Sequence, residues 1–308
     1  MSNSPARLFC ACLVVLLLGL YSLGSAQSPA ASPDKAADPL GWAKQQFASA
    51  YALSTSGDYR GAERLYSEVV AIESEKLGPE HPITLHSRNN HANALRDLGR
   101  YVEAEAAHRA VLASRERILG PQHNDTLSSR NNLALALTGQ KKYSEAEAEF
   151  RIVLPYREKV LGPEHADTLS TRNNLALALA GQKKHAEAEA EHRTVLQVRI
   201  RVLGAEHHET LTSRNNVAVV LYSQGKYAEA LLEHQAVFQV RERVQGAEHP
   251  GTLTSLLNMG LCLKQQNRID DAAPLFQRSA VGLRKVLGPE HPNTRQAEAL
   301  YRQVTTKQ

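Results

Sequence analysis

The sequence predicts an all-α protein: a right-handed superhelical solenoid of about six 42-residue helix–turn–helix repeats with a capping helix at the C-terminus. The segment "LGPEHPITL" at residue 77 returns as "LGPQHNDTL" at 119 and "LGPEHADTL" at 161, and three further copies begin at 203, 245 and 287. Small and large side chains also recur at fixed places in each copy. Self-similarity at one fixed period is the signature of stacked repeats, in which each unit buries its apolar face against the next.

Each copy reads as a pair of helices, because apolar residues recur at helical spacing on both sides of a short turn. The first helix has one small position, followed three residues later by leucine, and the second helix has an alanine position. Small residues admit a neighbouring helix and large residues fill the space beside it, so these positions predict interlocked helix pairs. In order, the three sets are Ala50, Ala92, Ala134, Ala176, Ala218 and Gly260; Leu53, Leu95, Leu137, Leu179, Leu221 and Leu263; and Ala62, Ala104, Ala146, Ala188, Ala230 and Ala272.

Two features predict irregularities within the repeats. Gly99 and two equivalent glycines hold the helix-ending position, where a left-handed backbone suits glycine. Lys141, Lys183 and Asn267 hold this position in the other copies, and in the third and fourth units a glycine falls two residues earlier, so the turns of these two units should differ. Pro155 lies well inside a second helix and should bend or break it.

Four segments follow one another along the chain. Residues 1–26 read as a secretory signal, because Arg7 precedes an apolar run from Leu8 to Tyr21 and small residues then end at Ala26. The alternative is an uncleaved anchor, although this run is shorter than the roughly 20 apolar residues of a membrane span. Residues 27–38 read as a flexible spacer, 39–286 as the six repeats and 287–308 as a capping half-repeat.

Composition and motifs argue against several classes of function. The net charge is only +4, and basic residues alternate with glutamates, so we expect no nucleic-acid partner. Two of the three cysteines fall in the expected signal, which leaves Cys262 as a small core residue. No phosphate loop, nucleophile elbow or His-Glu-x-x-His motif is present, so we expect neither an enzyme nor a cofactor. The repeated marker holds one histidine per unit, and units about 10 Å apart cannot converge on a zinc ion whose ligands lie at about 2.1 Å.

The most unusual feature is an asparagine pair inside the first helix, repeated every 42 residues at 89–90, 131–132, 173–174 and 215–216. Asparagine in a helix interior costs roughly 0.6 kcal/mol relative to alanine, because its amide competes for backbone hydrogen bonds. The pair lies off the packing face that Leu175, Ala176 and Leu179 define. We therefore expect it to face a groove, solvent or the adjacent unit.

The segment "LGPEHADTLSTRNNLALALAGQKKHAEAEAEHRTVLQVRIRVLG" resembles the 42-residue tetratricopeptide repeat of kinesin light chain-like proteins, and the resemblance covers about residues 40–300. It implies a superhelix whose first helices line a concave groove for extended peptides. The chain lacks a heptad segment for a motor heavy chain and has the expected signal, which suggests a secreted bacterial relative without the motor role. In the family, the second asparagine bonds the peptide backbone, which here implies Asn90, Asn132, Asn174, Asn216 and Asn258.

The residues beside this position have two interpretations. Each asparagine of a pair, the first as well as the second, can either face the groove or bond the adjacent unit and so hold the stacked repeats together. The arginines before each pair can form a basic strip that favours acidic peptides, or can pair with glutamates such as Glu105 or Glu147. Asn93 makes the groove more polar in the second unit. At the same position, Leu135 and Leu177 make the groove apolar in the third and fourth units. The first asparagines are Asn89, Asn131, Asn173 and Asn215, and the arginines are Arg88, Arg130, Arg172 and Arg214.

The sequence thus predicts an exported, periplasmic or secreted, non-enzymatic scaffold that binds an extended or acidic peptide, or a partner subunit. No cofactor, metal or nucleic acid is expected, and no membrane span once the signal is cleaved. The alternative function is a structural or self-assembling component of a cell-envelope complex, in which the asparagines serve only the stack.

Overall fold

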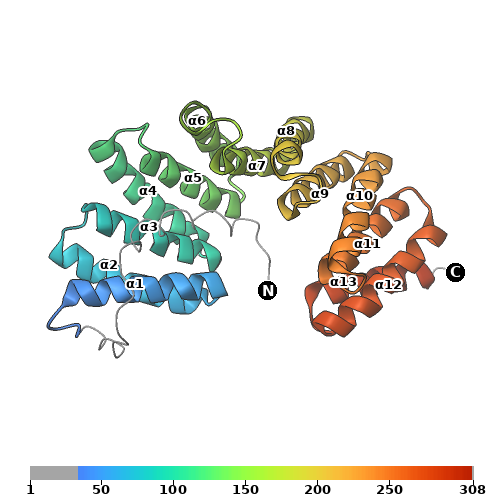
Figure 1. The fold of residues 1–308 in the computed structure, drawn as a ribbon, viewed down its shortest axis with the longest axis horizontal. Helices are drawn as coiled ribbons and strands as arrows, with labels where there is room; N and C mark the ends of the chain where they lie inside the picture. Colours follow the sequence, from blue (N-terminus) through green and yellow to red (C-terminus); the bar gives the residue numbers. More distant parts are fainter. Residues whose placement is uncertain (1–33, 307–308) are drawn as a thin grey trace, which may run out of the picture. The chain divides into compact units, whose positions relative to one another are not determined.

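A computed structural model describes residues 34–306, and every regular element in this range is an α-helix (Figure 1). The predicted all-α class and the stacking of consecutive helices are confirmed. The expected signal segment and most of the expected spacer lie outside the described residues. The thirteen helices of the described range are α1 Pro39–Ser56, α2 Tyr59–Lys76, α3 Pro82–Asp97, α4 Tyr101–Leu119, α5 Asn124–Gly139, α6 Tyr143–Leu161, α7 Ala166–Gly181, α8 His185–Leu203, α9 His208–Ser223, α10 Tyr227–Gln245, α11 Pro250–Gln265, α12 Ile269–Leu287 and α13 Pro292–Thr305.

The described residues form two compact units, one ending at Asn174 and the other beginning at Leu175, so the boundary falls within α7. Within each unit a helix packs mainly against the helices before and after it in sequence. In the first unit, α3 also contacts α5 directly, so adjacent first helices touch. In the described part of the chain, no helix is both long and apolar enough to cross a membrane.

The small and large positions identified in the sequence form the core of both units. Ala50, Ala134 and Ala218 of the first helices are completely buried, as are the alanines of the second helices. At Gly260 a Cβ atom would lie 2.6 Å from the ring of Phe276, so alanine there would require the ring to shift. The small position is therefore set by an aromatic side chain of the partner helix.

Each second helix places one ring in this core, at a position that the sequence pattern did not reveal. The rings recur every 42 residues, and none is more than 3% exposed. Three are imidazoles, and among the described residues their Nδ1 atoms have no hydrogen-bond partner. The six residues are Tyr66, His108, Phe150, His192, His234 and Phe276.

The predicted difference between the turns and the predicted break at Pro155 are wrong. Lys141, Lys183 and Asn267 have φ angles of 63°, 64° and 60°, so they adopt the left-handed conformation that glycine adopts at Gly99 (φ 80°). Since the non-glycine residues accept this strain, the turns of the third and fourth units follow the same course. Helix α6 likewise continues through Pro155, which is exposed, so the carbonyl that loses its helical partner can bond water.

The histidine of the repeated marker is the N-cap of a first helix. In all six copies its Nδ1 atom accepts a hydrogen bond, 3.0–3.3 Å long, from the backbone N–H two residues later. Side-chain caps of this kind stabilise a helix by about 1 kcal/mol. The histidines therefore stabilise the starts of the first helices, and they are His81, His123, His165, His207, His249 and His291.

An arginine, buried in three repeats and half-buried in the fourth, joins each of the helices α4, α6, α8 and α10 to the first helix of the next repeat. Its Nη1 atom donates to a backbone carbonyl ten residues later, at 3.0–3.2 Å, and to a serine or threonine hydroxyl fourteen residues later, at 2.7–3.1 Å. In the first repeat Glu73 takes this place; burial raises its pKa, and a hydrogen bond with Ser87 partly offsets the rise. The arginines are Arg115, Arg157, Arg199 and Arg241.

Candidate peptide-binding surface

The predicted site residues lie on the first helices of the repeats, in α3, α5, α7, α9 and α11. Most are partly exposed, whereas Asn90 is only 9% exposed. We call the row of asparagines at the two repeated positions the asparagine row: Asn89, Asn90, Asn131, Asn132, Asn173, Asn174, Asn215, Asn216 and Asn258.

Two bonds of the asparagine row join adjacent repeats. Asn132 Nδ2 donates to Asn89 Oδ1 at 3.1 Å, and Asn258 Nδ2 donates to Asn215 Oδ1 at 3.4 Å. In both cases the second asparagine of one repeat bonds the first asparagine of the repeat before it. These bonds support the stack-locking role at these positions, and each amide still keeps hydrogen-bonding capacity for a ligand.

The corresponding bond is missing between Asn131 and Asn174. The Oδ1 atom of Asn131 is buried and has no donor among the described residues, and Asn174 makes no hydrogen bond within that range. Elsewhere in the row, Asn90 Nδ2 donates to the His86 carbonyl at 3.0 Å. Asn131 and Asn174 therefore form an open rung in an otherwise engaged row.

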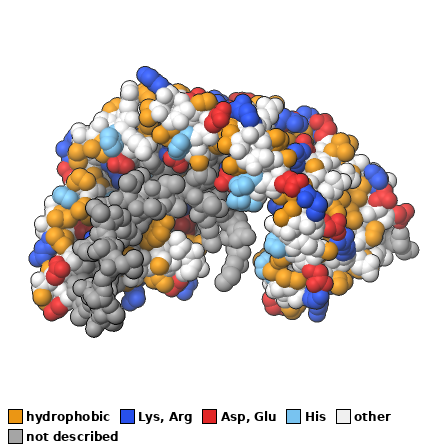
Figure 2. All heavy atoms as spheres, in the orientation of Figure 1, with side chains coloured by type: hydrophobic (Ala, Val, Ile, Leu, Met, Phe, Trp, Pro, Cys, Tyr) orange, Lys and Arg blue, Asp and Glu red, His pale blue; other side chains and the backbone are white. Residues whose placement is uncertain are grey.

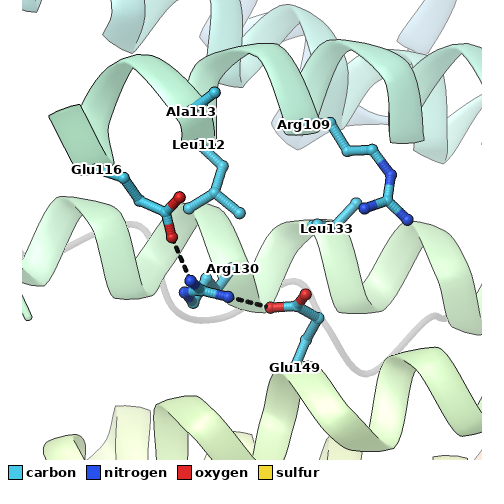
Figure 3. A pocket seen from close by; sticks show the side chains of 7 residues that line it. All are labelled: Arg109, Leu112, Ala113, Glu116, Arg130, Leu133 and Glu149. Atoms are coloured by element: carbon cyan, nitrogen blue, oxygen red, sulfur yellow. Dashed lines mark hydrogen bonds and ion pairs between the residues drawn. The ribbon is translucent and has the colours of Figure 1, made fainter. Parts of the chain in front are cut away.

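Most of the arginines beside the row are neutralised. Arg130 is bonded by Glu116 of α4 and, at 2.7 Å, by Glu149 of α6 (Figure 3). Arg172 pairs with Glu158, and Arg214 pairs with Glu233 at 2.8 Å. A pairing role was one of the two interpretations, but its glutamates differ from those suggested by the sequence. Glu105 instead bonds Arg109 and Lys142, and Glu147 bonds Arg151.

Arg88 is the exception. It makes no hydrogen bond or ion pair with any residue between 34 and 306, and its charge acts on Glu80 only at longer range. Ser74 and Ala107 occupy the positions that correspond to Glu116 and Glu149, which explains the missing pairs. Among the four arginines beside the asparagine row, the one without a bonded carboxylate therefore lies in α3 of the first unit.

A shallow hollow of about 280 Å³ lies beside Arg130 (Figure 3). The side chains that line it are Arg109, Leu112, Ala113, Glu116, Arg130, Leu133 and Glu149, from α4, α5 and α6. Its charges are already paired across the hollow, so it offers no unbalanced charge to a ligand. Figure 2 shows the same mixing of acidic and basic side chains over the visible face.

One helical turn after the second asparagine, the surface changes from polar to apolar. Asn93 occupies this position in α3 and accepts a hydrogen bond from Arg96 at 3.4 Å. Leu177 in α7 is 42% exposed and Val219 in α9 is 49% exposed, whereas Leu135 in α5 is half-buried. Exposed aliphatic side chains thus stand beside the asparagine row in the second unit.

Two titratable side chains near these helices have pKa values shifted by their surroundings. Although burial raises the pKa of Glu105, hydrogen bonds from Lys142, Gln140 and Arg109 bring it to about 2. Burial raises the pKa of the Cys262 thiol to about 11. No group of three or more His, Cys, Asp or Glu side chains that could hold a metal lies in the described range.

Family models identify the repeat. One model described as tetratricopeptide repeat matches residues 84–159, 130–192, 167–233 and 216–280, and a second matches residues 50–83. The chain belongs to the tetratricopeptide repeat family. Tetratricopeptide repeat (TPR) proteins are protein–protein interaction scaffolds and are typically not enzymes. A search of curated proteins gave no match to this TPR chain.

Solved structures resemble this TPR protein along most of its length. A candidate kinesin light chain from Podosopora anserina, with nearly identical TPR-like repeats, is 27% identical over 66% of this chain and 96% of its own, with a TM-score of 0.58. BtubC (BKLC) from P. vanneervenii is 20% identical over 81% of this chain and 94% of its own, with a TM-score of 0.59. The apo quorum sensor NprR from B. thuringiensis is 13% identical over 86% of this chain and 71% of its own, with a TM-score of 0.63. The last two show a shared fold.

Proposed function

We propose that this TPR protein is an exported, non-enzymatic scaffold that binds an extended peptide or a partner subunit along its first helices. The family supports an interaction role. The asparagine row supports peptide backbone as the ligand, because an amide both donates and accepts and so can bond a backbone of any sequence. The proposed partner is a protein, with no nucleic acid, no cofactor and no membrane span after signal cleavage.

The open rung is the observation that carries this proposal. A purely structural row gains stability when every rung is bonded, since a buried acceptor without a donor costs about 1–3 kcal/mol. Asn131 nevertheless keeps a buried oxygen without a donor, and Asn174 keeps a free amide in the described structure. The partly exposed amide of Asn174 can donate to a peptide C=O and accept from a peptide N–H, so the peptide backbone is proposed to bind at this rung.

The second candidate function is a structural or self-assembling component of the cell envelope. The bonds Asn132–Asn89 and Asn258–Asn215 favour it, because they show the row joining adjacent repeats. For an acidic ligand, the support is limited to Arg88, since the arginines of the next three repeats pair with glutamates.

Peptide selection separates the two functions. A random peptide display library is selected on the purified protein, and each enriched peptide is then measured on two variants. Asn174→Ala should weaken binding about 2- to 10-fold, because one hydrogen bond is worth about 0.5–1.5 kcal/mol. Val244→Ala, on an exposed site of the second helix α10, is the matched control and should change nothing.

The absence of any enriched peptide, together with concentration-dependent self-association in light scattering, would favour the structural role. Enrichment of peptides whose affinity falls with Val244→Ala and is unchanged by Asn174→Ala would instead place peptide binding on the second helices and refute the open rung as the site.

Export is tested at the N-terminus. The chain is expressed in a bacterial host from Met1, the cells are fractionated, and the protein is sequenced from its N-terminus. Cleavage after Ala26 predicts a periplasmic or secreted protein that begins at Gln27. A membrane-bound protein that retains residues 1–26 would instead establish the uncleaved anchor.

A further inference from the structure

The later repeats show how the arginine before each asparagine pair holds a carboxylate. Arg130 bonds Glu116 of the preceding second helix through Nη2, and its Nη1 donates to Glu149 of the following second helix at 2.7 Å (Figure 3). Arg172 bonds a glutamate at the first of these two positions, and Arg214 bonds one at the second position, at 2.8 Å. At this place on a first helix, the guanidinium is therefore within reach of carboxylates from both neighbouring second helices.

Arg88 has the same place in α3 but lacks both carboxylates. The two glutamate positions hold Ser74 in α2 and Ala107 in α4, and all three side chains are partly exposed. The charge of Arg88 acts on Glu80 at longer range, and the carboxylate of Glu80 is already bonded to Arg117. Two small uncharged side chains thus stand where later repeats place glutamates, and a ligand can reach the guanidinium between them from solvent.

The free guanidinium lies beside the asparagine row. Asn89 follows Arg88 directly and accepts the hydrogen bond from Asn132 of α5 at 3.1 Å. Asn131, which precedes Asn132, carries the buried acceptor of the open rung, and α3 contacts α5 directly. A peptide lying along the row from the open rung to α3 therefore meets an unpaired guanidinium only at its α3 end, because the arginines of the next two repeats are already paired.

Resting on the proposed function, we infer that Arg88 binds the carboxylate of a Glu or Asp side chain at one end of the peptide, in the place that Glu116 or Glu149 takes at Arg130. A guanidinium can donate two parallel hydrogen bonds to one carboxylate, and such charge-assisted bonds are stronger than neutral ones. Solvent weakens a partly exposed pair, so one acidic residue should raise the affinity of a peptide about three- to tenfold. Acidic residues elsewhere in the peptide should add nothing.

A random peptide display library, selected in parallel on the wild type and on Arg88→Gln, tests the inference. Peptides selected on the wild type should carry an acidic residue near one end more often than those selected on the variant. Fluorescence anisotropy then compares each enriched acidic peptide with the same peptide in which the acid is replaced by its amide. The acidic form should bind the wild type about three- to tenfold more tightly, whereas Arg88→Gln should bind both forms equally.

An arginine of the same unit provides the matched control. Arg64 is exposed on α2 and, like Arg88, makes no hydrogen bond or ion pair with any residue between 34 and 306. Arg64→Gln changes the net charge by the same amount as Arg88→Gln. It should keep the preference for the acidic peptide, because the preference is assigned to one guanidinium and not to the charge of the whole unit.

The missing glutamates allow a second test that leaves Arg88 in place. Ser74→Glu combined with Ala107→Glu reproduces the two pairs of Arg130, so the preference for the acidic peptide should disappear. Ser74→Gln combined with Ala107→Gln introduces side chains of the same size without charge and should keep the preference. Thermal unfolding of each variant checks that the substitutions leave the protein folded.

The outcomes separate the inference from the proposed function. If enriched peptides lose affinity with Asn174→Ala but their acidic and amide forms bind the wild type equally, the peptide-binding surface stands and the carboxylate site at Arg88 is refuted. The site is also refuted if the acidic preference survives Arg88→Gln or the double glutamate substitution. If neither selection enriches any peptide, the inference and the proposed function are both refuted.

Discussion

Replacing the buried histidines with phenylalanine should make the protein resistant to mild acid. His108, His192 and His234 occupy the core position that Phe150 and Phe276 fill in other repeats, so the position accepts a six-membered aromatic ring. The triple variant His108→Phe, His192→Phe and His234→Phe therefore keeps the packing and removes the titratable groups. His108 lies in the first unit and the other two in the second, so the single variants test each unit separately.

The magnitude follows from the pKa values of the folded protein. Burial, with smaller contributions from Arg96 and Arg115, lowers the pKa of His108 to about 3, and burial lowers the pKa of His192 to about 4. Burial and the charge of Arg241 lower that of His234 to about 4. In the unfolded chain the pKa of each histidine is about 6.5. Below this pH the unfolded state therefore binds protons at these histidines, whereas the folded state leaves them neutral. Stability is therefore fully present above about pH 6.5 and falls as the pH drops toward 4. At about pH 5 the loss is about 2 kcal/mol for each histidine, from about 1.36 kcal/mol per pKa unit.

Urea denaturation, followed by circular dichroism at about pH 7.5 and pH 5, measures the effect. Between these values most carboxylates stay ionised, and the remaining histidines are common to both proteins, so the difference between wild type and variant isolates the three rings. The wild type should lose about 6 kcal/mol more than the triple variant, summed over both units. An identical pH dependence for the two proteins would refute the reasoning, because the imidazoles would then be charged or solvated in the folded state.

Three further changes have defined outcomes. Glu73→Arg should raise the stability of the first unit by about 1–3 kcal/mol in urea denaturation, because it replaces a buried carboxyl with the arginine clamp of later repeats, and Ser87 supplies the hydroxyl; a lower midpoint would contradict this. Lys141→Gly should raise the melting temperature, because the left-handed backbone conformation costs a non-glycine residue about 1–2 kcal/mol. A clear decrease in the melting temperature would show that no strain exists there. Asn132→Ala should lower stability by about 1 kcal/mol through its lost inter-repeat bond, whereas Asn174→Ala should leave it equal or slightly higher; equal losses from both would remove the distinction between closed and open rungs.

The sequence was sufficient to predict the helix pairs, because a position that is buried against the same neighbour in every repeat keeps a residue of the same size. Alanine at position 134 and leucine at position 137 have to stay small and large wherever the same neighbour recurs, and both are completely buried. The turns were mispredicted because a left-handed backbone favours glycine without requiring it, and Lys141 accepts the strain. The break at Pro155 was mispredicted because the exposure of the carbonyl that the proline leaves unbonded depends on the fold.

The polar contacts of the site were beyond prediction for a different reason. An arginine recurring at 115, 157, 199 and 241 was visible in the sequence, but its burial and its hydroxyl partner require the packing of adjacent repeats. The partners of Arg130, Glu116 and Glu149, lie on two different helices, so no local spacing links them. Likewise, Asn132 and Asn89 are 43 residues apart and meet only when adjacent repeats stack.

The side-chain amide of Asn174 offers the most direct test of the proposed peptide binding. The ¹⁵N-labelled protein is titrated with a peptide enriched by library selection, and the Asn174 Nδ2 resonances are identified by their loss in Asn174→Ala. Binding of the peptide backbone at the open rung predicts saturable shifts of these resonances, with the signals of Val244 and its neighbours unchanged. Saturable shifts confined to the surface around Val244, with the Asn174 amide unmoved, would contradict binding along the first helices.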